Sequence, residues 1–404
     1  MAELSSQGLN TNKDFLALPV DAISELCLFL SPKDAINLSR TCSALHPLIK
    51  QLHNVWRVYC KRVWLYSGPC SPGSSWYSEF LHWIDGWGQY MDCFADIKRA
   101  WDLVYLKFHQ SDKNPDIIFR PGASERVLCD AETRLGYKLP TSYRCFLRIH
   151  NGQMGAKNSS LFGTELQFYH IKDEGSYLSP AEDLLQNLGL VCMTNHGRLQ
   201  SYMLCVEPSS HSKAGEVKCH SKTTTGQLKS IKLHTCAPSF TDWFCKLGHQ
   251  FQSYPVIDGV IMRFPYSSEC IATTRGICIQ VGTAFSDVYS RHIDDSLVIY
   301  HITISMSEHE SGSLASQLIT RHWSISDEKG AKEPIEGPGV VGYTPIISPG
   351  TVFTYTSGSH VERDWSLMEG YFTFVNQRTG ETFQAKVPPF KLIVPPYTWV
   401  QLPI

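Results

Sequence analysis

The sequence predicts a multidomain α+β protein, with helices first and strands dominating the end. Two observations lead to this prediction. Over residues 14–64, apolar residues recur three and four positions apart, as on one face of a helix. From about residue 258 onward they alternate with polar residues, as in a strand with one buried face. The 404 residues are enough for two or three domains, each with its own core.

Four short amphipathic helices are expected first. One begins after Pro19, and a second follows Ser31, which can cap it with Asp34 three residues later. Ser43 and Asn54 are expected to start the third and fourth. The stripe expected to be buried on the first helix is Ile23, Leu26, Cys27 and Leu30. Four helices in about 45 residues bury too little apolar surface to be very stable alone. We therefore expect this unit to complete its core against a partner.

These helices match a known motif. The matching residues are Leu18–Asp21, Leu26–Leu30, Asp34, Leu38, Arg40–Cys42 and Val55–Arg57. The segment resembles an F-box, the motif that docks a protein onto the Skp adaptor of a cullin-based ubiquitin ligase, and we assign it to residues 1–66. The resemblance implies adaptor-binding or supporting roles for Leu18, Pro19, Leu26, Leu30, Leu38 and Trp56. The alternative is a small helical cap on a larger domain.

Residues 67–87 are expected to form a linker and an aromatic helical segment. Ser67–Ser75 contains two prolines and two glycines among small residues, which is typical of a linker. Trp76–Trp87 carries aromatic residues at helical spacing, a pattern more often used for packing than for binding a ligand.

Residues 88–255 are expected to form a second domain. Ser124 can cap a helix that Gly136 ends, and Leu139–Pro140 can start another that Asn151–Gly152 ends. This spacing resembles the signature of the SUKH superfamily, whose α/β domains serve mostly as protein-binding scaffolds or immunity proteins. The resemblance implies a central α/β SUKH-like domain.

Residues 258–404 are expected to form an antiparallel β-sandwich. Apolar and polar residues alternate along Val298–Met306, and Tyr371, Thr373 and Val375 continue the alternation further on. Turn residues such as Arg378–Gly380 separate the strands. We expect this part to fold as a domain of its own.

The string Gly337–Gly342 matches G-x-G-x-x-G by letter. A dinucleotide site needs a helix directly after such a loop, with its N-terminus facing the pyrophosphate. Pro345 and Pro349 forbid a helix there. We therefore exclude a dinucleotide-binding fold.

The same region resembles another family. The matching residues are Gly337–Gly342, Pro345, Ile347–Gly350, Phe353, Tyr355–Gly358 and Met368–Phe374. They resemble the ApaG domain, a small β-sandwich of fibronectin III-like type. The resemblance makes the following residues candidates for binding a ligand or target: Gly337, Gly339, Gly342, Tyr355 and Tyr371.

Two interpretations of the glycine loop remain open. Its backbone N–H groups could bind phosphate, or its glycines could serve a hairpin that needs positive φ. Pro338 lacks an N–H, and no Lys or Arg lies nearby in the sequence. Both facts favour the structural interpretation.

No signature of an enzyme is present. None of the 14 Cys and 16 His lies in a recognisable nucleophile motif. A zinc site from Cys205, Cys219–His220, His234 and Cys236 has spacings that fit no compact module. We expect no catalytic residue, metal or cofactor.

Composition excludes further classes. A net charge of −2 gives no attraction to nucleic acid, and no apolar stretch reaches a membrane-spanning length. The polar start predicts no signal peptide, and scattered cysteines without C-x-x-C predict reduced thiols in the cytosol or nucleus.

The order F-box, SUKH-like, ApaG-like is that of a family of eukaryotic F-box proteins. It implies a non-catalytic substrate-recognition subunit of an Skp–cullin–F-box E3 ubiquitin ligase, which recruits targets for ubiquitination and proteasomal degradation. The expected partners are the Skp adaptor, through it cullin and a RING protein, and an unknown protein substrate, in nucleus and cytoplasm. The alternatives are a ligand- or phosphate-sensing protein acting through the ApaG-like domain, and an unrecognised hydrolase.

Overall fold

The structure is a computed structural model of the chain. It describes residues 16–68, 73–111, 118–154, 167–168, 171–172, 177–187, 190–195, 200–209, 212–221, 230–254, 256–257, 260–261, 266–286, 296–308, 315–327, 330, 332–362, 364–394 and 398–401. The chain divides into two compact parts, Met1–Ile97 and Lys98–Ile404. As predicted, it is α+β, with helices first and antiparallel sheets last.

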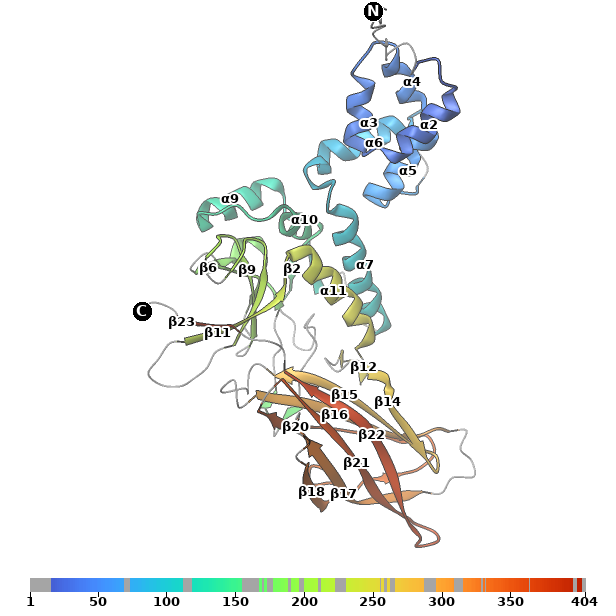
Figure 1. Cartoon of the computed structure of the whole chain (residues 1–404), viewed down its shortest axis with the longest axis vertical. Helices are drawn as coiled ribbons and strands as arrows, with labels where there is room; N and C mark the ends of the chain where they lie inside the picture. Colours follow the sequence, from blue (N-terminus) through green and yellow to red (C-terminus); the bar gives the residue numbers. More distant parts are fainter. Residues whose placement is uncertain are drawn as a thin grey trace, which may run out of the picture. The chain divides into compact units, whose positions relative to one another are not determined.

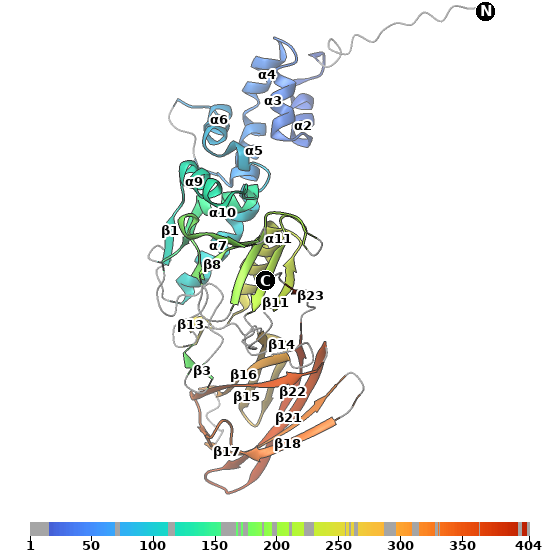
Figure 2. The ribbon, with the colours of Figure 1, turned by 90° about the vertical axis from the view of Figure 1, so that its left-hand side faces the viewer.

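The first part is a small helical unit (Figures 1 and 2). Its helices are α2 (Val20–Phe29), α3 (Pro32–Ser39), α4 (Leu45–Gln51), α5 (His53–Trp64), α6 (Trp76–Trp87) and the short η1 (Gly88–Tyr90). The Ser31 hydroxyl accepts a hydrogen bond of 3.1 Å from the Asp34 N–H, which confirms the predicted cap of α3. The predicted caps Ser43 and Asn54 were wrong. Helix α4 begins after Ala44, and α5 begins one residue before Asn54.

Four helices belong to the central domain. They are α7 (Phe94–Gln110), which crosses the boundary between the two compact parts, α9 (Glu125–Leu135), α10 (Thr141–Ile149) and α11 (Phe240–Ser253). The Ser124 hydroxyl caps α9, and α9 ends at Gly136, as predicted. Helix α11 lies along one face of the central sheet (Figure 2).

The central sheet has six strands in the order β23-β11-β10-β9-β7-β6. Their bounds are β6 (Leu185–Asn187), β7 (Leu190–Cys192), β9 (Gln200–Cys205), β10 (Val217–Ser221), β11 (Ser230–Ala237) and β23 (Thr398–Gln401). Short two-stranded pairs are β1 (Phe119–Pro121) with β2 (His150–Gln153), β3 (Gln167–Phe168) with β4 (Ile171–Lys172), β5 (Tyr177–Leu178) with β8 (Thr194–Asn195), and β12 (Val256–Ile257) with β13 (Val260–Ile261). A single turn, η2, spans Ala181–Asp183.

Aromatic packing joins the helices of the central domain. The Trp101 ring on α7 stacks on Phe146 of α10, with centroids 4.8 Å apart, and meets Phe244 of α11 at 5.1 Å. Near the end of α11, the ammonium of the buried Lys107 donates to the Gln252 carbonyl oxygen at 3.2 Å. Burial lowers the pKa of Lys107, because the charged form loses hydration.

A buried carboxylate joins α9 to α10. The Glu132 side chain lies 2.8 Å from the Lys138 ammonium and 2.7 Å from the Arg144 guanidinium, and it accepts from the Leu139 N–H at 3.0 Å. Burial alone raises the pKa of Glu132, but these three partners together hold it below its ordinary value. The link between the two helices therefore depends on an ionised Glu132.

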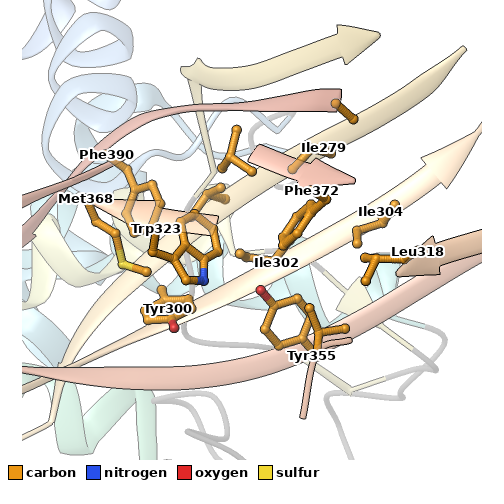
Figure 3. Packing of buried hydrophobic residues seen from close by; sticks show 14 of the residues in the cluster. Ile279, Tyr300, Ile302, Ile304, Leu318, Trp323, Tyr355, Met368, Phe372 and Phe390 are labelled. Atoms are coloured by element: carbon orange, nitrogen blue, oxygen red, sulfur yellow. The ribbon is translucent and has the colours of Figure 1, made fainter. Parts of the chain in front are cut away.

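The C-terminal domain is a two-sheet sandwich, and Figure 3 shows its core. One sheet has β14 (Tyr266–Thr274), β15 (Ile277–Ser286), β16 (Ser296–Met306) and β20 (Val352–Val361). The other has β18 (Lys332–Pro338), β17 (Ser316–Ser326), β21 (Trp365–Asn376) and β22 (Thr382–Ile393), with β19 (Ile346–Ile347) paired to β17. Trp323, Tyr300 and Phe390 pack against one another, with ring centroids 5.7–6.1 Å apart.

In strand β21 the buried residues differ from those that the sequence alternation picked out. Phe372 and Phe374 are fully buried, whereas Tyr371, Thr373 and Val375 are half-buried. Both alternating sets of residues in this stretch are apolar, and the set with the larger phenyl rings faces the core. The sandwich ends with β22. Strand β23 lies within the predicted domain 258–404, but it pairs with β11 of the central sheet.

Candidate protein-binding surfaces

Helix α2 carries an uncovered apolar face. Ile23 and Cys27 are buried and anchor the helix. Phe29 is 87% exposed and Leu26 is 46% exposed. Exposed apolar residues continue towards the N-terminal side as Leu16, Leu18 and Val20. Clustered large apolar side chains that the described residues leave uncovered are typical of protein-binding surfaces.

Tyr59 of α5 fixes the C-terminal end of α2. Its hydroxyl donates to the Cys27 carbonyl oxygen and lies 3.3 Å from that of Leu30. The Arg62 guanidinium lies over the Tyr59 ring and donates to the Leu30 carbonyl oxygen at 3.3 Å. Burial raises the pKa of Tyr59 to about 12, so the hydroxyl remains a donor at neutral pH. The helix that presents Phe29 is therefore rigidly held.

The structure separates the six residues predicted to bind or support the adaptor. Leu18, Pro19 and Leu26 are exposed, and Leu30 and Leu38 are half-buried. Trp56 is fully buried, and its indole N–H donates to the Ile49 carbonyl oxygen. Direct contact between Trp56 and an adaptor is thereby ruled out, because its neighbours α4 and α6 cover it. Phe29 and Val20, which the sequence interpretation did not select, are more exposed than the four leucines and the tryptophan among the six.

The helical unit extends past the predicted boundary at residue 66. Helix α6 packs on α5, with ring centroids of Trp56 and Tyr77 4.8 Å apart and those of Trp64 and Trp83 stacked at 5.8 Å. Phe80 of α6 is fully buried. The segment predicted as a linker with an aromatic helix thus supplies part of the core of the first compact part, which reaches Ile97.

The glycine loop is a tight hairpin on the sandwich. Gly339 has φ +55° and Gly342 has φ +86°. The Gly339 N–H donates to the Ile319 carbonyl oxygen at 2.7 Å, and Val340 and Tyr343 exchange two backbone bonds of 2.8 Å. Because these N–H groups are used within the fold, they cannot form an anion-binding concavity. The geometry supports the interpretation that the glycines serve a turn.

The expectation that no cation lies near the loop was wrong. Arg321 on β17 is paired opposite Gly337 on β18. Its guanidinium donates to the carbonyl oxygens of Pro338 and Gly339 at 3.1 and 3.0 Å. It also lies against Gly337, where a Cβ would approach it to 3.0 Å. Arg321 therefore braces the base of the hairpin.

The two tyrosines predicted with the loop have different surroundings. Tyr355 is buried in the sandwich core, and burial raises its pKa far above the ordinary value (Figure 3). It is therefore not a surface residue that could contact a target. Tyr371 is half-buried and stacks on His322, with ring centroids 4.4 Å apart.

Within the described ranges, no three of His, Cys, Asp and Glu come together as metal ligands. None of the helices in the described part of the chain is long and apolar enough to span a membrane.

The fold defines the class of the protein: a helical unit with an uncovered apolar helix face, an α+β domain and a β-sandwich. The sequence matches the SMI1 / KNR4 family (SUKH-1) over residues 122–246 and the ApaG domain over residues 290–376. The two matches lie within the central domain and the sandwich, and they confirm the presence of a SUKH-like and an ApaG-like domain.

Whole-chain relatives narrow this class. The chain is 32% identical to F-box only protein 3 of Bos taurus over 400 aligned residues. The alignment covers 94% of this chain and 84% of the relative. Identity to F-box only protein 3 of Homo sapiens is also 32%, covering 94% and 83%. Protein ApaG of Shewanella baltica is 38% identical over 125 residues, 31% of this chain and 95% of that protein. The chain belongs to the F-box only protein 3 family.

Proposed function

We propose that the chain is the substrate-recognition subunit of an Skp–cullin–F-box ubiquitin ligase. The first compact part binds the Skp adaptor, and through it cullin and a RING protein. The central domain and the sandwich bind the target. The chain performs no bond chemistry, and it acts by holding the target close to the ubiquitin-loaded enzyme. We place this activity in the nucleus and cytoplasm.

The apolar face of α2 carries this proposal. Phe29 presents almost its whole side chain to solvent, although Ile23 and Cys27 on the same helix are buried. A partner that covers Phe29, Leu26 and Leu18 removes this apolar surface from water. Each Å² of apolar surface buried contributes about 25 cal/mol of favourable free energy. Tyr59 and Arg62 hold the C-terminal end of α2 in place, so little ordering is needed on binding.

Calorimetry of the full chain with a purified Skp adaptor tests the proposal. Phe29→Ser and the pair Leu18→Ala with Leu26→Ala should each weaken binding at least tenfold, because truncation of a hot-spot anchor costs about 2 kcal/mol or more. Leu81→Ser is the matched control, since Leu81 is 37% exposed on α6 in the same unit. Adaptor affinity that is unchanged by the α2 variants, or no adaptor binding at all, would contradict the proposal.

A further inference from the structure

Strand β20 is an edge strand of the sandwich. It pairs with β16 over its whole length without a shift of register, and no other described strand pairs with it on its other side. Its ten residues span about 34 Å, at about 3.4 Å per residue. An edge of this kind presents a row of backbone N–H and C=O groups to which another extended chain can pair.

The hydrogen bonds just before β20 show which backbone groups of β16 face it. The Met306 N–H donates to the Thr351 carbonyl oxygen at 3.2 Å, and the Met306 carbonyl oxygen accepts from the Gly350 N–H at 2.9 Å. Met306 therefore directs both of its backbone groups towards β20. Every second residue of β16 before it does the same, because the bonding direction alternates along a strand.

The register then assigns the outward groups of β20. The residues of β20 that bond to β16 are the partners of this alternate set: Phe353, Tyr355, Ser357 and Ser359. Thr354, Thr356 and Gly358 lie between them, so their N–H and C=O groups point away from β16. Within the described residues, no backbone bond satisfies these outward groups. We call Thr354, Thr356 and Gly358 the β20 edge.

The other edges of the sandwich are protected against pairing. On the edge strand β18, Pro334 and Pro338 lack the N–H that a further strand would need. At the other side of the sandwich, β14 and β22 lie against each other, and both carry a shift in their pairing register. Strand β20 contains no Pro, Lys, Arg, Asp or Glu. It therefore has none of the usual protection of a long edge strand.

The core side of β20 is incompletely covered. Phe353 packs against the core but remains half-buried. Its ring meets that of Tyr343, which is 63% exposed, with centroids 6.3 Å apart. Strand β3 of the central domain comes close to β20, but it pairs with β4. A strand added to β20 would place every second side chain on the core side, beside Phe353.

Charge distinguishes between the possible occupants of this edge. Before the strand, the exposed Glu308 lies against Gly350. After it come the exposed Glu362 and Asp364, and this end stays negative when the charge of Arg363 between them is included. Two antiparallel copies of β20 would bring these acidic ends together, which disfavours a second copy. A segment with Lys or Arg beside its extended part is favoured instead.

We propose that the β20 edge binds an extended segment of the target protein as an added strand, with a basic residue next to it. The backbone of the segment bonds to the outward groups of the β20 edge, and its alternate apolar side chains pack beside Phe353. Its Lys or Arg pairs with Glu308 or Glu362. This inference rests on the proposed function, because it names how that subunit holds its target. Backbone bonds supply affinity in this mode, and alternate side chains supply specificity.

A phage library of random peptides of about 12 residues, longer than the ten of β20, is selected on the full chain and supplies the probe. The selected peptides should alternate apolar with polar residues and should contain Lys or Arg. A synthetic peptide is then titrated by fluorescence anisotropy, with one backbone nitrogen methylated at a time. Affinity should fall at least about tenfold at every second residue and stay within about twofold at the residues between. Recognition of side chains alone would not produce this alternation.

Thr354→Pro tests the same bonds from the side of the protein. It removes one outward N–H and leaves the bonds to β16 intact, so peptide affinity should fall about tenfold. The urea midpoint of the full chain, measured by pulse proteolysis, should stay within about 0.3 M of wild type. Thr354→Val is the matched control, because it keeps the N–H and the branched shape, and its peptide affinity should be unchanged. Glu308→Lys should weaken binding of the basic peptide several-fold.

Several results would overturn the inference. They are the selection of acidic peptides or of none, a methylation scan without alternation, and equal peptide affinity of Thr354→Pro and Thr354→Val. The methylation scan uses the wild-type chain, so it decides the question even where a variant fails to fold. Self-association of the chain that Thr354→Pro abolishes would show that a second copy occupies the edge instead.

Adaptor binding is measured separately, with the α2 variants. Loss of adaptor binding with intact peptide binding would refute only the ligase assignment. The reverse result would refute only the role of the β20 edge.

Discussion

The indole N–H of Trp56 donates a hydrogen bond of 2.7 Å to the Ile49 carbonyl oxygen, and this bond joins α5 to the end of α4. The same ring meets Tyr77 and Phe80 of α6 at centroid distances of 4.8 and 5.4 Å. One buried side chain therefore connects three helices. The residue that the F-box pattern places near its end therefore supports the packing of the helical unit from within.

Trp56→Ala should loosen the whole helical unit. Truncation of a buried Trp costs about 3–5 kcal/mol, and Trp56→Phe should cost less because only the hydrogen bond and part of the ring are lost. Hydrogen exchange of the full chain should show lost protection over residues 20–64 in Trp56→Ala. The surface variant Phe29→Ser should keep wild-type protection there. Protection that survives in Trp56→Ala would contradict the packing role.

Gly339→Val should destabilise the sandwich. A Cβ at Gly339 would lie 2.3 Å from the Tyr343 carbonyl oxygen, at a φ of +55° that valine resists. We expect a loss of about 2 kcal/mol or more in a urea titration. Gly342→Ala should cost less, because nothing lies within 4 Å of its Cβ position.

The glycine loop should not bind nucleotides. Its N–H groups at Gly339, Val340 and Tyr343 already bond within the fold. Titration of the full chain with ATP, NAD or pyrophosphate should therefore leave the melting temperature unchanged. A saturable rise at sub-millimolar ligand would instead support the ligand-sensing alternative.

Glu132 should make the central domain sensitive to acid. Its pKa is depressed in the fold, so its contribution is present above the ordinary value of 4.5 and is lost as pH falls through the lower folded value. Glu132→Gln should cost about 3 kcal/mol at pH 7, since it breaks the buried ion pair between the Glu132 carboxylate and the Arg144 guanidinium, although Arg144 keeps its ion pair with Glu125. The difference in stability between wild type and variant should shrink below pH 4.5. A difference that stays constant down to pH 3 would refute this role.

His301 should make the sandwich sensitive to mild acid. It is 3% exposed on β16, with Nδ1 2.8 Å from the Thr356 hydroxyl of β20, and burial lowers its pKa to about 4. Between pH 6.5 and 4 the unfolded chain binds this proton and the fold does not, so stability falls as pH falls. The expected slope is about 1.4 kcal/mol per pH unit. Pulse proteolysis in urea should show this slope, reduced in His301→Gln.

Periodicity predicted the elements better than it predicted which faces are covered. Ile23, Leu26, Cys27 and Leu30 form one apolar stripe in sequence, yet only Ile23 and Cys27 are buried. A helical period shows that a stripe is apolar, and it does not tell whether the same chain or a partner covers it. For this reason the exposure of Phe29 became visible only in the fold.

The cation beside the glycine loop was missed for a different reason. Arg321 precedes Gly337 by 16 positions, and strand pairing places the two residues opposite each other. Such a neighbour depends on the register of β17 and β18, which local sequence does not reveal. The caps at Ser31 and Ser124 were predictable because each involves an N–H only three residues away.

The pairing of β23 with β11 has a consequence for the order of folding during synthesis. Residues 230–233 of β11 pair with residues 398–401, which the ribosome makes more than 160 positions later. Until then this edge of the central sheet offers unpaired backbone groups to other strands. Most of the central domain is therefore synthesised early, but its sheet is complete only after β23 has been made. During that interval a newly made chain is most exposed to mispairing, and a chaperone that shields residues 230–233 would have most effect.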